Sequence, residues 1–313
     1  MSADVIDLAI IGGGPAGMSA ALVAGRARLR TVVVNEEQPR NAVTTASHGF
    51  LTRDGAHPAE LLSIAKQQLR KYDTVRYVQG RAQGVEAVAG GVRLHANGET
   101  VTARRVIIAT GYRDDLASLK LPGIVDVYGK SVYPCPFCDG FEHRDERIAV
   151  FGAAGAEHLV PVVRVWSSDV ILFTNGEALD EAVASSMRDK GVEVVLEPVV
   201  RLHSTDGNLT AVEVHGGRTV VRDSGFVASD TSVPATKFPD ELGVGTTVND
   251  WGMEVCETHD AGKTNVANVY VVGDASHGFS GLIDAAAEGS RCAADIVIEL
   301  AMERWAASGS STG

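Results

Sequence analysis

The sequence predicts an α/β protein built from two doubly wound, Rossmann-like domains, and two βαβ patterns carry this prediction. In the first, an apolar run at 5–11 leads into the glycine-rich stretch 12–17, an alanine-rich helix and a strand at 31–34. In the second, an apolar strand at 148–151 is followed by a helix and another strand at 170–173. Strands that alternate with helical patterns in this way are typical of a parallel sheet covered by helices.

The other expected elements are shorter or lie later in the chain. Pro58 suits the first turn of a helix that runs to about Tyr72, and Asn97-Gly98 indicates a β-hairpin. The remaining expected elements are a buried strand at 105–109, a helix at 177–190, turns at 206–208 and 216–217, a strand at 269–272 and a long helix at 283–302.

The second βαβ unit is predicted to interrupt the first. It begins near 121–123 (Leu-Pro-Gly), and the polar stretch 231–242, which contains two prolines, suits a crossing back to the first domain. We therefore expect one domain formed by two segments and a second domain between them. The expected segments are 1–115, 116–240 and 241–313.

Composition excludes several classes of partner. The 313 residues are 45% hydrophobic, which is enough for two cores, and the net charge is -12 with a pI of about 5.2. Nucleic acid and anionic membrane both attract basic faces, so neither is expected as a partner. No apolar run approaches the roughly 20 residues of a membrane span, and the N-terminus has no basic region of a signal peptide. We expect a cytoplasmic protein.

Gly12, Gly14 and Gly17 match the pattern G-x-G-x-x-G of dinucleotide-binding folds. The first glycine permits a tight turn, the second lets the backbone approach a pyrophosphate, and the third packs the helix closely on the strand. The N-terminus of that helix then faces the phosphates. Because the pattern follows a strand and opens a helix, we predict a dinucleotide site here.

Two later motifs favour FAD as the dinucleotide. Thr110-Gly111 and Gly273-Asp274 each follow an apolar strand, so an extended cofactor gains contacts along its length. The Asp274 carboxylate suits the ribityl hydroxyls. An acidic residue usually ends the second strand and binds a ribose hydroxyl. Here Asn35 holds that position and Glu36 is the alternative, unless Glu36 lies in a solvated loop.

The stretch Cys135-Pro136-Phe137-Cys138-Asp139 carries the chemistry. Two intervening residues bring both sulfurs within bonding distance on the first turn of a helix, whose N-terminus favours the reactive thiolate. Asp139 is a candidate acid/base for the thiol proton transfers. A zinc site needs four ligands, usually from a second close pair, and Cys256 and Cys292 stand alone. We therefore expect no metal, and two packed, unreactive thiols.

Over nearly its whole length the sequence resembles the low-molecular-weight thioredoxin reductase family, whose motifs occur in the order just described. The resemblance implies a pyridine-nucleotide domain inserted into an FAD domain, FAD as cofactor, and a homodimer. It also implies that Cys138 faces the flavin, that Cys135 attacks the substrate and that Asp139 is the acid/base. The expected cofactor-binding residues are Gly12, Gly14, Pro15, Ala16, Gly17, Asn35, Glu36, Asn41, His48, Ala82, Thr110, Gly111, Gly273 and Asp274.

One branch of that family is more similar than the others. The runs 39–42 (Pro-Arg-Asn-Ala) and 48–55 (His-Gly-Phe-Leu-Thr-Arg-Asp-Gly), with the Cys-Pro-Phe-Cys motif, look like the small-molecule dithiol oxidases. These include the enzymes that form the disulfides of gliotoxin, holomycin and romidepsin. Many members carry His after the second cysteine, whereas Asp139 resembles the thioredoxin reductases. The resemblance therefore leaves the subfamily open.

The second nucleotide motif is degraded. In the stretch 152–157 (Gly-Ala-Ala-Gly-Ala-Glu), Ala154 replaces the second glycine and Glu157 the third. A methyl group obstructs the pyrophosphate, and a carboxylate is bulky and of the wrong charge. The stretch 173–177 (Phe-Thr-Asn-Gly-Glu) lacks the arginines that bind a 2′-phosphate. We therefore expect poor use of NADPH.

Three functions are compatible with these motifs, in decreasing order of support. The first is an FAD-dependent dithiol oxidase that passes electrons from Cys135 and Cys138 to oxygen or another acceptor. The second is a thioredoxin-reductase-like disulfide reductase that takes electrons from NADPH, ferredoxin or another flavin. The third is a flavoprotein redox sensor. The expected substrate is a small-molecule dithiol or a small redox protein.

Overall fold

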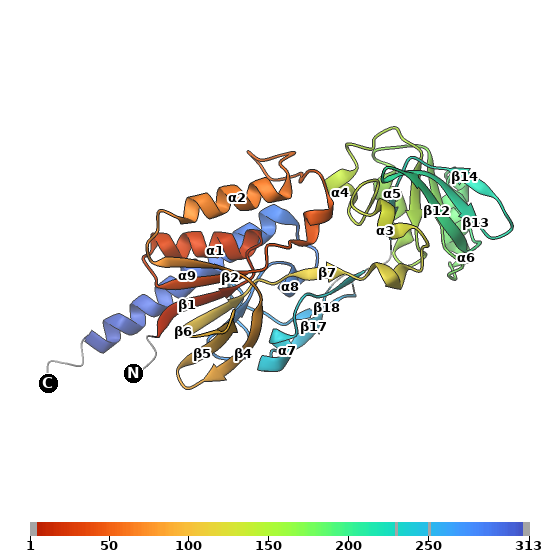
Figure 1. Ribbon diagram of the computed structural model, residues 1–313. Helices are drawn as coiled ribbons and strands as arrows, with labels where there is room; N and C mark the ends of the chain where they lie inside the picture. The colour runs from red at the N-terminus through yellow and green to blue at the C-terminus, as the bar shows by residue number, and fades with distance from the viewer. Residues whose placement is uncertain (1–4, 229–230, 250–251, 309–313) are drawn as a thin grey trace.

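The computed structural model describes residues 5–228, 231–249 and 252–308. Two α/β units lie side by side and are joined by a pair of crossing segments (Figure 1). The first unit combines the early and late parts of the chain, and the second is inserted between them. The predicted fold class is confirmed.

A seven-stranded sheet forms the first unit, in the order β3-β2-β1-β6-β5-β4 with β19 beside β6. In register, Ile11 lies opposite both Val34 and Ile108, and Val271 also lies opposite Ile108. The carboxyl ends of these four parallel strands therefore meet at one edge of the sheet. The strands are β1 (Ile6–Ile11), β2 (Thr31–Asn35), β3 (Val75–Gln79), β4 (Ala82–Val88), β5 (Gly91–Ala96), β6 (Glu99–Ile108) and β19 (Val269–Val271).

Both faces of this sheet are covered, because its central strands are apolar on both sides. Leu8 and Ile10 face the helices α1 (Pro15–Arg26), α2 (Pro58–Leu69) and α9 (Gly281–Ser308), which lie on one side (Figure 1). Ala9 and Ile11 face the other side, where Phe238 belongs to the same core. The elements there are α7 (Phe238–Leu242), β17 (Thr246–Val248) and β18 (Glu254–Cys256).

The second unit contains a five-stranded parallel sheet in the order β11-β10-β9-β15-β8 and a three-stranded sheet β12-β13-β14. Its strands are β8 (Val132–Tyr133), β9 (Ile148–Phe151), β10 (Val170–Phe173), β11 (Glu193–Val195), β12 (Val199–Thr205), β13 (Asn208–Val214), β14 (Thr219–Val221) and β15 (Ser224–Val227). Its helices are η2 (Leu116–Leu119), α3 (Ile124–Val127), α4 (Pro136–Asp139), α5 (Ala156–Val163) and α6 (Glu181–Asp189).

Two short antiparallel strands connect the units: β7 (Tyr112–Asp114) leaves the first unit and β16 (Ser232–Pro234) returns to it. The segment 235–240, which we had placed with the inserted domain, follows this return. Its Phe238 packs in the core of the first unit. The chain therefore changes unit within the paired strands.

Most predicted elements occur near their expected positions. Asn97 and Gly98 join β5 to β6 with φ of 51° and 77°, as a two-residue hairpin turn requires. The helix expected at 177–190 begins later, at Glu181, because Asp180 caps it and the Glu177 side chain bonds elsewhere. Among the described residues, no helix is long and apolar enough to cross a membrane.

Close packing of α1 on α9 yields the first testable prediction. In Gly289→Ala the new Cβ would lie 1.9 Å from the Ala16 carbonyl oxygen. Alanine gains about 1 kcal/mol of helix propensity, but overpacking costs about 1–3 kcal/mol. Because this clash is with backbone, its cost should lie in the upper part of that range, about 2–3 kcal/mol. We therefore expect a net loss of about 1–2 kcal/mol in the free energy of unfolding.

Thermal unfolding of the purified holoenzyme measures this effect. Ser290→Ala, one position along the same helix, is the control and should unfold at or above the wild-type temperature. Equal unfolding temperatures for the two variants would show that α1 and α9 can move apart without cost.

Candidate active site

The three motifs of the first unit meet at the common strand edge. A side chain at Gly12 would lie 2.2 Å from the Ala109 carbonyl oxygen, and one at Gly273 would lie 3.1 Å from Cβ of Ala16. Gly111 likewise faces Cβ of Asp274. Residues separated by more than 250 positions in the sequence thus line one site.

The glycine loop fits a dinucleotide pyrophosphate. Gly14 caps α1, and a Cβ placed there would meet no atom within 4 Å, so the backbone is open to a ligand. Pro15 occupies the first turn of α1, where its missing N–H costs no helical hydrogen bond. The helix N-terminus then presents the remaining N–H groups to an anion. The backbone of 12–17 would therefore hold the phosphates of FAD.

Two polar residues at the end of β2 differ in their surroundings. The Asn35 side chain lies against Gly13, and its Nδ2 donates to the Tyr77 hydroxyl at 2.9 Å. Glu36 pairs with Arg81 at 3.1 Å on the surface. Asn35 thus borders the glycine loop, whereas the Glu36 side chain forms an ion pair with Arg81. Ala82, also expected to bind the cofactor, is buried at the start of β4.

The other cofactor motifs carry hydrogen-bonding groups. Thr110 Oγ1 lies 3.2 Å from Thr236 Oγ1, close to where the chain re-enters the first unit. The Asp274 carboxylate, at the start of the short helix α8 (Asp274–His277), accepts from the hydroxyl and backbone N–H of Ser280. Burial raises the pKa of Asp274. Its second oxygen remains for a ligand hydroxyl or for Arg40, which lies 3.9 Å away.

The cysteine pair occupies the short helix α4. Cys135 is the N-cap and Pro136 the first helical residue, so the Cys135 sulfur lies at the helix N-terminus. Donation from the Cys138 thiol lowers the pKa of Cys135, and backbone N–H groups and the charge of Arg40 add to this against the effect of burial. The same hydrogen bond, with burial, raises the pKa of Cys138. The surroundings of the reduced pair therefore favour the thiolate at Cys135 over Cys138.

Asp139 is placed to exchange protons with the pair. Burial raises its pKa to about 7, the Cys135 thiolate and Glu142 add to the increase, and His48 opposes it. A carboxyl group with this pKa can both accept and donate a proton near neutral pH. The α4 segment thus places two thiols beside a carboxyl group whose pKa suits an acid/base.

Asn41 and His48 come from a connection of the first unit. Asn41, in the short helix η1 (Arg40–Val43), donates to Ser47 Oγ at 3.0 Å. The two ring nitrogens of His48 each lie 3.6 Å from a carboxylate, one from Asp54 and the other from Glu142. His48, expected among the cofactor-binding residues, therefore lies beside Glu142, which follows α4, the helix of the cysteine pair (the redox helix).

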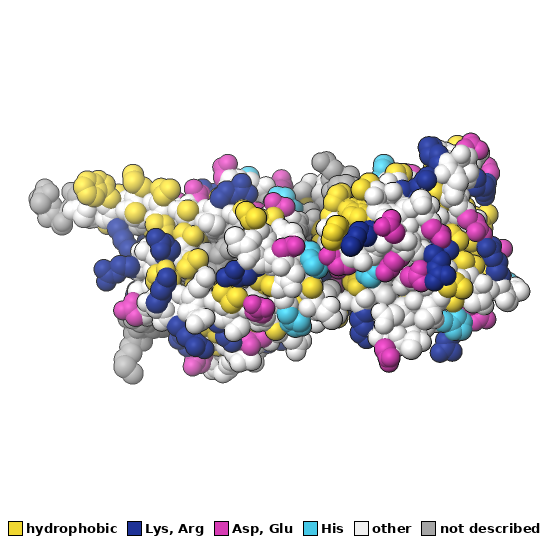
Figure 2. All heavy atoms as spheres, turned by 90° about the horizontal axis from the view of Figure 1, so that it is seen from above, with side chains coloured by type: hydrophobic (Ala, Val, Ile, Leu, Met, Phe, Trp, Pro, Cys, Tyr) yellow, Lys and Arg dark blue, Asp and Glu magenta, His cyan; other side chains and the backbone are white. Residues whose placement is uncertain are grey.

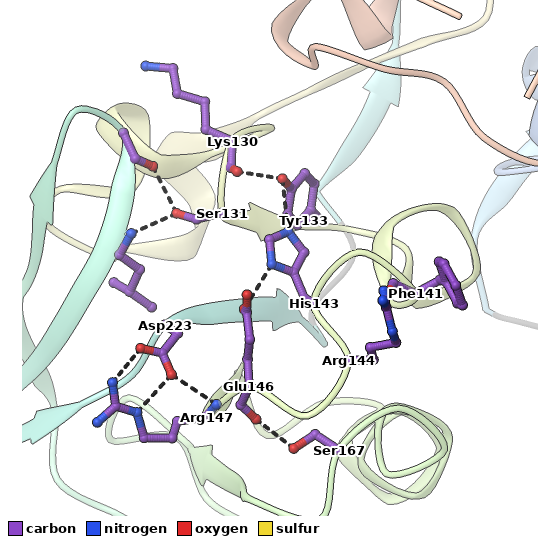
Figure 3. Close-up of polar contacts among 12 residues, drawn as sticks. Lys130, Ser131, Tyr133, Phe141, His143, Arg144, Glu146, Arg147, Ser167 and Asp223 are labelled. Atoms are coloured by element: carbon purple, nitrogen blue, oxygen red, sulfur yellow. Dashed lines mark hydrogen bonds and ion pairs between the residues drawn. The ribbon is translucent and has the colours of Figure 1, made fainter. Parts of the chain in front are cut away.

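The segments before and after α4 are tied to each other (Figure 3). Nε2 of His143 lies 3.2 Å from the Tyr133 hydroxyl, and Nδ1 lies 2.9 Å from Glu146. The Tyr133 hydroxyl also donates to the Lys130 carbonyl. This contact closes the loop that contains both cysteines. His143, which follows the motif without a recognisable sequence signal, is thus a supporting residue that sequence reasoning missed.

Arg40 is a second missed residue, although it stands within the run that resembles the dithiol oxidases. Its side chain is 17% exposed and forms a bidentate pair with Asp114, with contacts of 2.5–3.1 Å. Its positive charge favours the thiolate at Cys135 and partly opposes the raised pKa of Cys138. Only the fold brings it to the junction of the two units.

The second glycine loop is closed by the protein itself. Glu177 Oε2, after β10, accepts the backbone N–H of Ala153 at 2.9 Å. The adjoining space, lined by Gly152, Asn175 and Glu177 among others, has a volume of about 10 Å³. A carboxylate of the chain therefore already engages one N–H group of the second glycine loop.

The described residues contain no cluster of metal ligands, and the inserted unit exposes apolar side chains around α4. Among residues 5–228, 231–249 and 252–308, no three His, Cys, Asp or Glu side chains are grouped as metal ligands. Figure 2 shows apolar side chains gathered on the inserted unit beside the junction. Phe137, Phe141 and Val165 are among its exposed apolar residues, and Phe137 meets the Trp166 ring edge-on. The redox helix therefore presents an apolar surface.

Comparison with known proteins agrees with this geometry. The model of the pyridine nucleotide-disulphide oxidoreductase family matches residues 6–290. The chain is 29% identical to thioredoxin reductase aclD of Aspergillus oryzae over 98% of this chain and 100% of that protein. It is 30% identical to thioredoxin reductase tcpT of Claviceps purpurea over 87% of each. The solved structure of HlmI aligns with a TM-score of 0.89 at 31% identity, covering 98% of this chain and 96% of HlmI.

Asp139 gives the second prediction. The single-turnover rate at which a dithiol reduces the Cys135–Cys138 disulfide should rise with pH, because the unprotonated carboxylate accepts the thiol proton. It should level off at or below about pH 7, since the disulfide lacks the thiolate that helps to raise the pKa of Asp139 to about 7. Asp139→Asn should lose this dependence and slow the step by about 10²–10⁴-fold.

Glu142→Gln is the matched control. The Glu142 charge raises the pKa of Asp139, so its removal should shift the rising limb to lower pH and leave the plateau rate nearly unchanged. An Asp139→Asn variant with the wild-type profile would exclude Asp139 as the acid/base.

Proposed function

Because the chain belongs to the pyridine nucleotide-disulphide oxidoreductase family, we propose a direction for its chemistry: it oxidises small dithiols to disulfides. Like its relatives, the chain is a thioredoxin-reductase-like, FAD-dependent thiol–disulfide oxidoreductase. The observation that carries this proposal is the contact between Glu177 and the Ala153 N–H, which engages one donor of the second nucleotide loop within the protein.

The closed loop argues against a nicotinamide donor on physical grounds. A pyrophosphate would have to displace the Glu177 carboxylate from the N–H group and would meet the methyl group of Ala154. Glu157, in the first turn of α5, adds negative charge at the same helix end. We therefore expect the thiols of the substrate, and not a nicotinamide, to donate the electrons.

The cysteine chemistry follows from the two thiol environments. A substrate thiolate attacks Cys135 of the enzyme disulfide, a mixed disulfide forms, and Cys138 leaves and takes up a proton. The second substrate thiol then attacks the substrate sulfur of the mixed disulfide and expels the Cys135 thiolate. The product disulfide leaves with two electrons fewer than the dithiol, and the pair is reduced to thiols.

Local electrostatics assist each of these steps. The lowered pKa of Cys135 makes it the better leaving group in the second step. Asp139 takes up the proton of the attacking substrate thiol. FAD, when bound, supplies the two-electron acceptor that regenerates the disulfide, with oxygen or another compound as the final acceptor. Gly14, Asp274 and the Thr110-Gly111 turn are the groups that would hold it.

The second candidate is a disulfide reductase that acts on thioredoxin or a similar small protein. Asp139 favours it, because this residue resembles the thioredoxin reductases, and aclD and tcpT are named as such. The same cysteine chemistry then runs in reverse, with electrons from NADPH, ferredoxin or another flavin. The apolar surface formed by Phe137 and Phe141 suits either class of substrate.

An anaerobic titration followed by flavin absorbance tests the third prediction. Dithiothreitol, used as the dithiol, should bleach the wild-type flavin within the mixing time of a manual experiment, and air should restore the colour. NADPH at the same concentration should bleach it at least about tenfold more slowly. Cys138→Ser, which cannot form the disulfide, should resist bleaching by the dithiol.

Each outcome discriminates between the candidates. Rapid bleaching by NADPH would establish a reductase and show that Glu177 yields to the nucleotide. A flavin that stays oxidised with dithiothreitol would eliminate the oxidase. Dithiol bleaching that persists in Cys138→Ser would mean that the thiols bypass the cysteine pair.

A further inference from the structure

Arg40 joins the first unit to both crossing strands. Its Nε and Nη2 bind the Asp114 carboxylate at 3.0–3.1 Å and 2.5 Å, and Nη2 also donates to Ser232 Oγ at 3.2 Å. Asp114 ends β7 and Ser232 begins β16. Thr231 Oγ1 donates to the same carboxylate at 3.1 Å. One guanidinium–carboxylate pair therefore holds the outgoing and returning strands against the first unit.

The other edge of the guanidinium faces the site. Nη1 is buried, makes no hydrogen bond among the described residues, and lies 3.9 Å from Asp274 Oδ2. The guanidinium carbon lies 5.5 Å from the centre of the Phe279 ring. The charged and titratable groups that respond to Arg40 or act on it are Asp114, Tyr128, Asp274, Cys135 and Cys138.

Burial gives these contacts their strength. The Arg40 and Asp114 side chains are 17% and 10% exposed, so their bidentate pair is screened less than a surface ion pair. Breaking such a pair from one side leaves an uncompensated, mostly buried charge. Lysine would retain the charge but lose the planar fork that reaches Asp114 and Ser232 together.

We propose that Arg40 is a positioning residue: it clamps the two crossing strands and thereby fixes how the inserted unit, which carries the redox helix, sits relative to the Gly273-Asp274 motif, and its buried Nη1 keeps a positive charge beside that motif. The clamp acts through Asp114 and Ser232, and the charge acts on Cys135. This role is independent of the direction in which the enzyme works, since both directions need the cysteine pair beside the cofactor motif.

Two measurements on FAD-loaded protein test both parts of the proposal. The first is the rate at which iodoacetamide alkylates Cys135 in the anaerobically reduced enzyme across pH 5–9, followed by mass spectrometry of the 131–144 peptide. The second is the rate of tryptic cleavage after Lys237, three residues beyond the end of β16. Neither readout depends on turnover.

Arg40→Met should slow alkylation of Cys135 at pH 7 by about three- to tenfold, because loss of the charge raises the pKa of the thiol. It should also speed cleavage after Lys237 several-fold. Asp114→Asn should speed cleavage without the loss in alkylation, because it keeps the Arg40 charge. Arg53→Met, which removes an exposed arginine whose side chain donates to the Thr52 carbonyl, should match the wild type in both assays.

The outcomes separate the clamp from the charge. Wild-type alkylation and cleavage in Arg40→Met would overturn the proposal. If that variant does not fold with FAD, Arg40→Lys and Asp114→Asn are used in its place to test the clamp. Faster tryptic cleavage in both variants supports the clamp, and unchanged cleavage in both overturns it.

Discussion

The first unit depends on backbone contacts that leave no room for a side chain. At Gly12, Gly17 and Gly289 a Cβ would lie 2.2 Å or less from a carbonyl oxygen of Ala109, Gly12 or Ala16. These contacts let the β1–α1 loop rest on the end of β6 while α9 packs on α1. The dinucleotide loop, the Thr110-Gly111 turn and the C-terminal motif then share one edge of the sheet. A larger residue at any of these positions would separate parts that must act together.

The glycine loops of the two units differ in what their backbone N–H groups can bind. A helix N-terminus carries partial positive charge and unpaired N–H groups, which attract an anion. In the first unit Gly14 leaves that place open to a phosphate. In the inserted unit the Glu177 carboxylate of the protein bonds to the loop instead. The inserted unit thus has the doubly wound fold, uses one N–H of its glycine loop internally, and carries the redox helix.

At the junction, burial and charge act together on a few residues. Burial alone would make thiolates and carboxylates costly. Here the helix N-terminus, the Cys138 thiol and Arg40 favour the Cys135 thiolate. Burial raises the pKa of the Asp139 carboxyl group to about 7. The first unit contributes Arg40 and His48, and the inserted unit contributes the cysteines and Asp139. The chemistry therefore depends on how the units are placed, which the paired strands β7 and β16 control.

The features that can be predicted from the sequence are those that are local in the chain. The βαβ patterns, the hairpin at Asn97-Gly98 and the cysteine motif on a helical turn each depend on neighbours within a few residues, so their periodicity and turn chemistry reveal them. The distant side chains that complete the site become apparent once the chain is folded. Arg40 binds Asp114 and Ser232. Glu177 accepts from the Ala153 N–H, and His143 contacts the Tyr133 hydroxyl. The spacing of these residues in the sequence does not predict any of these contacts. Long polar side chains have many partners within reach, and the packing of the two units selects one of them.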